Sequence, residues 1–204
     1  MSFEKEARVA CSKTGERLSE EGTWLTDNDV WGLCNLLAWQ KRQTDSDIRI
    51  IDPLVLKRLV MGVVPPESGE RSLFADPPRL LFLILNDDNT HWSVIILYSG
   101  EAYHCDSMYP YHSRYASSVM EKLDHLRLLT WRKITPVKSP RQRSGWECGI
   151  YTSLYCLVAM ECARFRPSQE EFLVDLEKLL ASDVNEAKRP EFTRVLLQLL
   201  QLIQ

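Results

Sequence analysis

The sequence has few cysteines and no long apolar run. Six cysteines in 204 residues are too few for a disulfide scaffold, and no two are spaced Cys-x-x-Cys, which disfavours a zinc ribbon or a redox dithiol. No apolar run approaches the ~20 residues that span a bilayer. The N-terminal stretch MSFEKEARVACSKTGER carries charges throughout and lacks the apolar core of a signal peptide. We therefore expect free thiols and a cytoplasmic or nuclear location.

The chain also lacks a concentration of charge of one sign. The formal net charge is −3 with 26% charged residues, and no Lys/Arg block is long enough to form a stripe for nucleic acid or anionic lipid. There is no internal repeat and no low-complexity tract. We expect a monomer that binds neither nucleic acid nor membrane.

What the sequence does contain is enough apolar material for one core. At 45% hydrophobic residues, 204 residues can form one well-buried domain, whereas two domains would each be small. Residues 1–22 are polar and aperiodic, which predicts a flexible N-terminal arm. Residues 23–204 are then a single domain that begins near Trp24.

Hydrophobic periodicity and capping residues predict a mixture of helices and strands. The expected helices cover about 27–41, 53–61, 113–126, 148–163, 168–180 and 190–200. Asp52, Ser113 and a Ser168-x-x-Glu171 capping box are the expected N-terminal caps of three of these helices. The expected strands cover about 48–51, 79–85, 91–98, 102–106 and 129–137, and the proline and glycine content of residues 64–70 predicts a loop. Helices, then a strand cluster, then helices indicate an α+β domain with a sheet flanked by helices.

Cys148 lies at the mouth of the apolar helix expected over 150–163. The unpaired N–H groups and positive dipole end of a helix stabilise an anion, so a thiol at this position can become a reactive thiolate. Most free cysteines are instead buried and inert, which is the interpretation that we give to Cys34, Cys156 and Cys162. For Cys148 the position favours a nucleophile.

The partners that a cysteine nucleophile needs occur upstream, in the order His91, Asp106, Gln142. His91 opens one expected strand and Asp106 closes another, so neighbouring strands would bring both to one sheet edge. His91 would act as base and then acid, Asp106 would orient its ring, and Gln142 would donate to an oxyanion. The plainer alternatives are a core histidine, a turn-forming aspartate and an ordinary loop glutamine.

Four motifs in this order resemble those of the ubiquitin-like-protein proteases, the papain-like cysteine peptidases that process and remove SUMO and the neddylation modifier. Trp24-Leu-Thr-Asp27 resembles the family's Trp-Leu-x-Asp motif, and Thr90-His-Trp-Ser93 resembles its His-Trp element. The stretch 103–107 resembles its Asp-Ser element, and Gln142 six residues before Cys148-Gly149 resembles its Gln-to-Cys-Gly element. The resemblance covers about residues 24–163.

This resemblance implies a papain-like α+β fold, a His91-Asp106-Cys148 triad, no metal and no cofactor. It also implies that Trp24 and Trp92 cover the diglycine tail of a ubiquitin-like modifier, and that Asp27 pairs with a basic residue near that tail. The alternatives are core tryptophans and an N-cap aspartate. The partners would be the modifier and its protein conjugates.

Among modifiers, several residues look closer to the deneddylase branch than to the SUMO proteases. They are Asn86-Asp87 ahead of Thr90-His91, and His104-x-Asp106-Ser107. SUMO or ubiquitin removal is the alternative within this class, and an acetyltransferase effector or a non-catalytic modifier-binding protein are alternatives outside it. Two departures from the family pattern are Trp146-Glu147 before the cysteine and three cations in the loop 138–144.

Overall fold

A five-stranded mixed sheet forms the centre of the molecule. The structure is a computed structural model that describes residues 13–41, 48–63, 69–76, 78–87, 90–183 and 189–201. The strands follow one another across the sheet in chain order: β1 (Ile48–Ile51), β2 (Leu80–Asn86), β3 (Trp92–Tyr98), β4 (Glu101–Cys105) and β5 (Ile134–Pro136). The inner pairs β2–β3 and β3–β4 are antiparallel, whereas β1 and β5 each pair in parallel with their neighbour.

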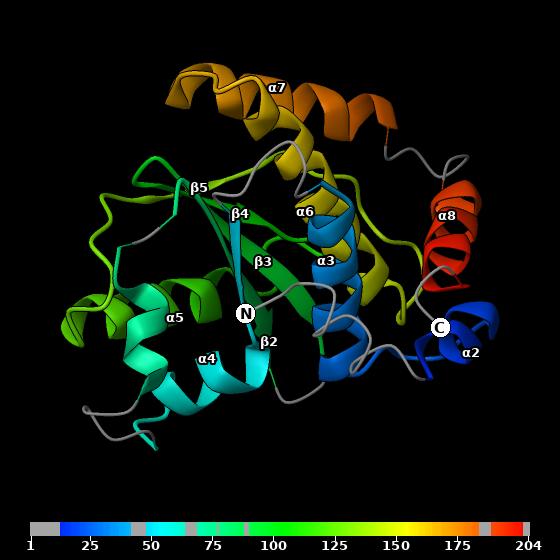
Figure 1. Ribbon diagram of the computed structural model, residues 1–204, viewed down its shortest axis with the longest axis horizontal. Helices are drawn as coiled ribbons and strands as arrows, with labels where there is room; N and C mark the ends of the chain where they lie inside the picture. Colours follow the sequence, from blue (N-terminus) through cyan, green and yellow to red (C-terminus); the bar gives the residue numbers. More distant parts are fainter. Residues whose placement is uncertain are drawn as a thin grey trace.

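Helices cover both faces of this sheet. They are α2 (Thr14–Ser19), α3 (Asp27–Lys41), α4 (Pro53–Val60), α5 (Ser113–His125), α6 (Cys148–Arg164), α7 (Gln169–Asp183) and α8 (Arg189–Gln201), with a 3-10 helix η1 (Gly69–Phe74). Figure 1 shows α3 and α6 side by side against the sheet, α4 and α5 on its other side, and α2 beside α8. This arrangement places the start of α6 beside the sheet.

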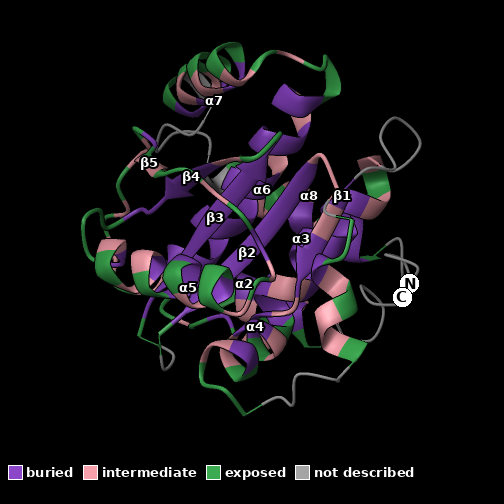
Figure 2. Cartoon of the chain, turned by 90° about the vertical axis from the view of Figure 1, so that its left-hand side faces the viewer, coloured by how far each residue is buried: buried purple, intermediate pink, exposed green. Residues whose placement is uncertain are grey.

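The central strands are apolar on both faces because helices bury both. In β2, alternate residues enter two cores: Leu80, Phe82 and Ile84 pack with α3 and α6, whereas Leu81, Leu83 and Leu85 pack with α4 and α5. Figure 2 shows the sheet and the helices packed on it as buried, with exposed residues on the outer surfaces of α5 and α7. The sheet is therefore a rigid frame for residues at its edge.

Most of the predicted elements are confirmed. The helices expected over 27–41 and 148–163 are α3 and α6, and the ends of the three central strands differ from prediction by at most one residue. Two predicted N-terminal caps are also present. The Asp52 side chain accepts a hydrogen bond from Leu54 N at 2.8 Å, and the Ser168–Glu171 capping box is formed.

The described part of the segment predicted as an N-terminal arm, residues 13–22, contains a short helix. Residues 14–19 form α2, and Leu18 is buried in the larger core. Arg17 and Thr14 donate to the buried Asp29 carboxylate at the start of α3, at 2.8 and 2.6 Å. A buried carboxylate needs such donors, so this tertiary contact overrides the weak local pattern. Residues 1–12 lie outside the described part.

Two smaller expectations need correction. The strand predicted over 129–137 is limited to the three residues of β5. Ser113 does not cap α5: the N-cap is His112, and Ser113 Oγ is buried without a hydrogen-bond partner in the described part of the chain. The loop predicted over 64–70 lies mostly outside the described residues, and its last two residues begin η1.

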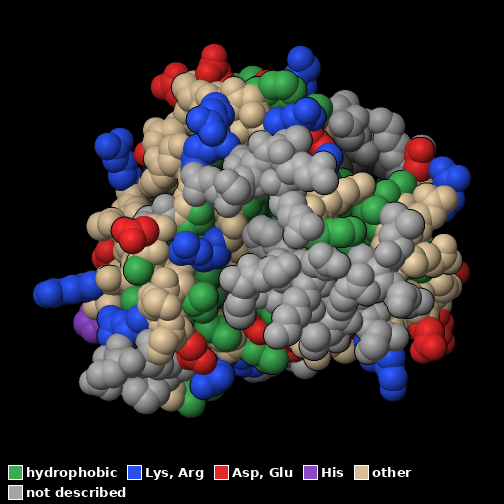
Figure 3. All heavy atoms as spheres, viewed as in Figure 1, with side chains coloured by type: hydrophobic (Ala, Val, Ile, Leu, Met, Phe, Trp, Pro, Cys, Tyr) green, Lys and Arg blue, Asp and Glu red, His purple; other side chains and the backbone are tan. Residues whose placement is uncertain are grey.

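The described surface carries both signs of charge. On the face drawn in Figure 3, Lys and Arg side chains are interspersed with Asp and Glu around the periphery. Of the helices in the described ranges, none combines the length and the apolar character that a membrane crossing requires.

Candidate active site

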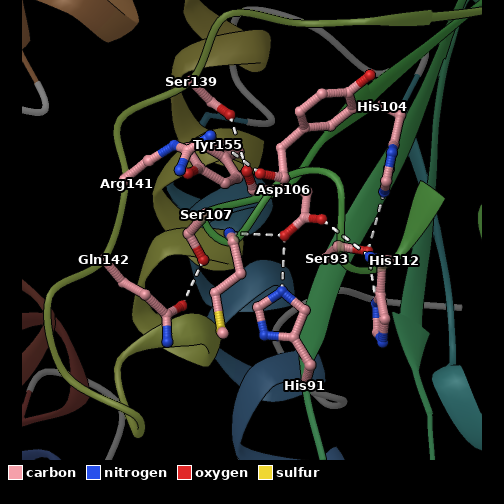
Figure 4. Close-up of polar contacts among 12 residues, drawn as sticks. His91, Ser93, His104, Asp106, Ser107, His112, Ser139, Arg141, Gln142 and Tyr155 are labelled. Carbon is pink, nitrogen blue, oxygen red and sulfur yellow. Dashed lines mark hydrogen bonds and ion pairs between the residues drawn. The ribbon is translucent and has the colours of Figure 1, made fainter.

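His91 and Asp106 meet at one edge of the sheet, as their positions in the sequence predict. His91 directly precedes β3 and Asp106 directly follows β4, and these strands are antiparallel neighbours. The ring Nε2–H of His91 donates to Asp106 Oδ1 at 2.7 Å, and the two side chains are 1% and 0% exposed. Figure 4 shows the Asp106 carboxylate above the His91 ring.

Hydrogen bonds keep the Asp106 carboxylate ionised. Burial by itself would raise its pKa, but the hydrogen bond from His91 and two backbone N–H donors, Met108 at 2.8 Å and His112 at 3.1 Å, lower the pKa to about 2. Asp106 therefore keeps a negative charge beside His91 at neutral pH.

The ring of His91 lies between Asp106 and Cys148. Burial favours the neutral ring, but hydrogen bonds with Asp106 and with the Cys148 thiol outweigh this and raise the His91 pKa to about 9. Because Nε2 is engaged by Asp106, Nδ1 is the nitrogen that faces the thiol; it has no nitrogen or oxygen partner among the described residues. The arrangement favours an imidazolium between two acidic groups.

Cys148 is the first residue of α6, as predicted. The preceding residue Glu147 is the N-cap, so Cys148 lies in the first turn of α6. The backbone N–H groups of a first turn have no partner within the helix and stabilise a negative charge nearby, such as that of a thiolate. The helix is buried along nearly its whole length and packs against both α3 and the sheet, which fixes its first turn. Cys148 is 0% exposed, and shielding from water strengthens its interaction with His91.

Gln142 lies in the loop that leads to α6 and is held at both ends of its amide. Its Oε1 accepts a hydrogen bond from Ser107 Oγ at 2.5 Å (Figure 4), and its Nε2 donates to Ser144 O at 2.8 Å. An amide nitrogen carries two hydrogens, so one N–H is left for a ligand. Ser107 therefore orients Gln142, a role that its place directly after Asp106 could have suggested.

The three residues predicted to contact substrate differ in exposure. The Trp24 side chain is 42% exposed, whereas Trp92 is 1% exposed and donates its indole N–H to Leu25 O at 3.1 Å. Asp27 is the first residue of α3, and its Oδ1 accepts from Asn86 Nδ2 at 2.8 Å. In the structure Asp27 Oδ1 therefore has one hydrogen-bond donor, and the Trp92 ring packs within the larger core cluster.

A buried polar network beneath the His91–Asp106 pair is the part of the site that the sequence does not reveal. Ser93 Oγ is hydrogen-bonded to His112 Nδ1 at 2.9 Å and to His104 Nε2 at 3.1 Å (Figure 4). The His112 ring packs edge-on against His91, with centroids 4.7 Å apart. Burial lowers the pKa of His104 to about 4, and burial together with the nearby His91 lowers that of His112 to about 3. Both rings are neutral at pH 7.

The two departures from the family pattern have structural roles. Glu147 is buried, and its Oε2 accepts from Ser144 N at 3.2 Å, which ties the Gln142 loop to α6. Arg141, one of the loop cations, donates to Tyr109 O at 3.1 Å and links this loop to the turn after Asp106. Both contacts support the position of Gln142.

The remaining cysteines of the described ranges are structural. Cys34, Cys105, Cys156 and Cys162 are free and buried, and burial raises the pKa of Cys105, Cys156 and Cys162. In the same ranges, no three His, Cys, Asp or Glu side chains are grouped so as to hold a metal ion. Cys148 differs from these four in that its thiol is hydrogen-bonded to the His91 ring.

Comparison with solved structures identifies the class of fold. The chain is similar to a structure described as a de-sumoylating protease, with a TM-score of 0.71, 13% identity, and coverage of 94% of this chain and 85% of that one. It is also similar to the Xanthomonas campestris effector protein XopD bound to ubiquitin, with a TM-score of 0.60, 20% identity, and coverage of 86% and 90%. At such low identity these likenesses establish the fold, which is that of the Ulp1-like cysteine proteases.

The sequence itself identifies the family. The model of the Ulp1 protease family, C-terminal catalytic domain, matches residues 36–189, which is more than half of the chain. The chain therefore belongs to the Ulp1 protease family, a family of cysteine proteases. A Ulp1-like SUMO protease catalytic domain from Chaetomium thermophilum has a TM-score of 0.56, 18% identity, and coverage of 86% of this chain and 73% of that one. A search of curated protein sequences found no match.

Proposed function

We propose that this protein is a cysteine isopeptidase and processing protease that cleaves after the C-terminal Gly-Gly of a ubiquitin-like modifier. The observation that carries the proposal is the His91 ring, hydrogen-bonded to Asp106 on one side and to the Cys148 thiol on the other. Family membership and the folds of known modifier proteases support the same reaction.

In the first step, the Cys148 thiolate attacks the carbonyl carbon of the terminal glycine. The carbonyl π electrons move to oxygen, and the free N–H of Gln142 Nε2 and the Cys148 backbone N–H stabilise the oxyanion. As the tetrahedral intermediate collapses, the C–N bond breaks and the His91 imidazolium gives its proton to the leaving amine. The products of this step are a thioester on Cys148 and a free amine.

In the second step, water hydrolyses the thioester. Neutral His91 takes a proton from the water, the resulting hydroxide attacks the thioester carbonyl, and the Cys148 thiolate leaves. His91 is again an imidazolium and Cys148 a thiolate, so the ion pair is regenerated. Asp106 holds the proton-bearing Nε2 throughout and keeps Nδ1 directed at the reacting atoms.

The residues near the start of α3 would receive the modifier's tail. Trp24, with its exposed ring, would cover the Gly-Gly segment, and Asp27 and Trp92 would complete this side of the site. A tail without side chains can pass beneath an aromatic ring where a β-carbon cannot.

The identity of the modifier is the finer part of the proposal. The sequence motifs around Asn86 and His104 favour the neddylation modifier, whereas the similar solved structures are described with SUMO or ubiquitin. We put the neddylation modifier first and SUMO or ubiquitin, including mixed specificity, as the alternative.

Side-by-side labelling with propargylamide probes of ubiquitin, SUMO and the neddylation modifier tests this proposal. A protease forms a covalent adduct on Cys148, and the Cys148→Ala variant forms none. Non-covalent capture without an adduct would indicate a modifier-binding protein, and no capture together with acetyl transfer from acetyl-CoA would indicate an acetyltransferase. The probe that reacts fastest identifies the modifier.

A further inference from the structure

Two surfaces flank the proposed catalytic residues at one edge of the sheet. The strand order is β1-β2-β3-β4-β5, with His91 directly before β3 and Asp106 directly after β4. On one side, Asp27 is hydrogen-bonded to the last residue of β2. On the other side lie the turn 107–111, which follows β4, and the loop 138–144, which follows β5. In the proposed reaction the modifier's tail occupies the β2 side, so the leaving amine and its protein lie toward the turn and the loop.

The turn after Asp106 borders the group that protonates the leaving amine. The Tyr111 ring meets the His91 ring edge-on, with centroids 5.4 Å apart. Tyr109 and Tyr111 are nevertheless 40% and 56% exposed. Tyrosine is enriched in protein–protein interfaces, because its large ring is apolar and its hydroxyl is polar. A polypeptide whose amine takes the proton of His91 therefore has two exposed tyrosines beside it.

The loop after β5 is attached to this turn. Arg141 Nη2 donates to Tyr109 O at 3.1 Å, and the backbone N–H of Gln142 donates to Ser107 O at the same distance. Figure 4 shows Arg141 and Gln142 on the loop that passes beside Asp106. Arg141 is exposed, and a guanidinium has five N–H donors, so it can hold Tyr109 O and also bind a carboxylate.

The two sides of the site carry opposite charge. Residues 107–118 and 139–146 contain three cations and no acidic residue, and the cations are all exposed: Arg114, Arg141 and Arg143. Residues 20–28, which include Trp24, contain three acidic residues and no cation: Glu20, Glu21 and Asp27. Because the whole chain has a net charge of −3, the positive side is a local feature. It is complementary to an acidic partner.

We propose that Tyr109, Tyr111, Arg141 and Arg143 form a leaving-group surface that binds an acidic segment of the target protein next to its modified lysine. This inference rests on the proposed function and adds the chemistry of the preferred conjugates. The lysine that carries the scissile bond lies with its apolar methylene groups along the tyrosine rings. Carboxylates of neighbouring Asp or Glu residues pair with the two arginines.

Synthetic conjugates test this preference. The modifier that labels Cys148 fastest is joined through its C-terminal glycine to the lysine of a short peptide, in which the residues on both sides of that lysine are Glu, Gln or Arg. We expect the wild-type kcat/KM to be about fivefold higher for the Glu than for the Gln conjugate, the size of an exposed ion pair or two, and lowest for the Arg conjugate. The preference should shrink as NaCl rises from about 0.05 M to about 0.5 M, because salt screens exposed charges.

Arg141→Glu identifies a residue that reads the charge of the conjugate. Its carboxylate repels an acidic segment and attracts a basic one, so the order of the Glu and Arg conjugates should reverse. Arg141→Lys keeps the positive charge and should keep the order. Loss of the contact with Tyr109 O slows every substrate if it disturbs Gln142, but this common loss cancels in the ratio of two conjugates. Lys133→Glu is the matched control, since Lys133 is exposed and directly precedes β5, at the end of that strand away from the site.

The outcomes separate this inference from the proposed function. Turnover of the modifier joined to a fluorogenic amine measures the reaction without a target protein. If the wild type cleaves that substrate but cleaves the three conjugates at equal rates, the reaction stands and the inference is overturned. An Arg141→Glu enzyme that loses the same fraction of activity on every substrate would also overturn it, because Arg141 would then only support Gln142. If the wild type cleaves no substrate, the proposed function fails and the inference fails with it.

Discussion

At the scale of single residues, the orientation of the His91 ring depends on the hydrogen bond that its Nε2–H donates to Asp106. Asp106→Asn keeps the shape of the side chain, but its amide can turn an N–H toward Nε2 and force the ring proton onto Nδ1, which faces Cys148. We expect kcat to fall on the order of 10⁴-fold, as in serine proteases with the same change. The measurement is turnover of a Gly-Gly substrate, with exposed Asp124→Asn as control. Near-normal turnover would reduce Asp106 to a turn-forming residue.

The raised pKa of His91 sets the alkaline limit of activity. His91 titrates with a pKa of about 9, so the imidazolium that protonates the leaving amine is present below that pH and is lost above it. We expect kcat/KM of the wild type to decline as the pH rises through about 9. A decline centred near 6.5, the ordinary histidine value, would show that Asp106 and Cys148 do not stabilise the charged ring.

Gln142→Ala should slow the chemistry without weakening binding. If Gln142 contacts only the oxyanion, its loss should raise the activation free energy by about 3 kcal/mol. This corresponds to a kcat lower by roughly a hundredfold at constant KM. Ser107→Ala should give a smaller loss, because Gln142 stays in place but loses the hydroxyl that orients its amide. A raised KM at unchanged kcat would instead assign Gln142 to substrate recognition.

The sequence predicts the proposed catalytic residues better than it predicts the residues that hold them in place. His91 and Asp106 could be placed together because each lies at the end of a strand and short connections make the strands neighbours. The Ser93 network could not be predicted, because it depends on His112, which reaches the site from the start of α5. The motif predicts a substrate contact for Trp92, whereas the burial of its ring is seen only in the structure.

At the scale of secondary-structure elements, α2 is stabilised by one buried carboxylate. Asp29 accepts from Arg17, Thr14 and Thr26. Arg17→Ala should destabilise the fold by about 2 kcal/mol, because charge-assisted hydrogen bonds to a buried group are lost. Urea unfolding measures this change. The control Arg194→Ala removes the exposed Arg194–Glu191 pair of α8 and should cost less than about 1 kcal/mol. Equal costs would mean that α2 is not anchored through Asp29.

The elements differ in how well local sequence predicts them. The apolar runs of α6 and β2 are long enough to specify buried elements, and Asp52 and Ser168 mark helix starts by their caps. By contrast, α2 has six residues, too few for a helix to be stable alone, and it forms because Arg17 and Leu18 find partners in the domain. Tertiary contacts that span the chain leave no trace in a local pattern.

At the scale of the whole molecule, the buried neutral histidines should make the fold sensitive to acid. The pKa of His104 is lowered to about 4, so between pH 6.5 and 4 the unfolded chain binds a proton there that the folded chain does not. Stability therefore falls as the pH is lowered through this range. His104→Gln, which offers Ser93 a similar polar atom, should reduce this dependence in urea unfolding. Exposed His125→Gln is the control. An unchanged dependence in His104→Gln would contradict the assignment.

The central claim is that Cys148 is the nucleophile of a protease for ubiquitin-like modifiers. Its most direct test is the turnover of a Gly-Gly-terminated modifier carrying a fluorogenic amine, measured for the wild type and for Cys148→Ala. We predict that the variant turns over at less than about a thousandth of the wild-type rate, the scale of losing one member of a nucleophile–base unit, while it still binds the modifier. Turnover by the variant above that level would contradict the account.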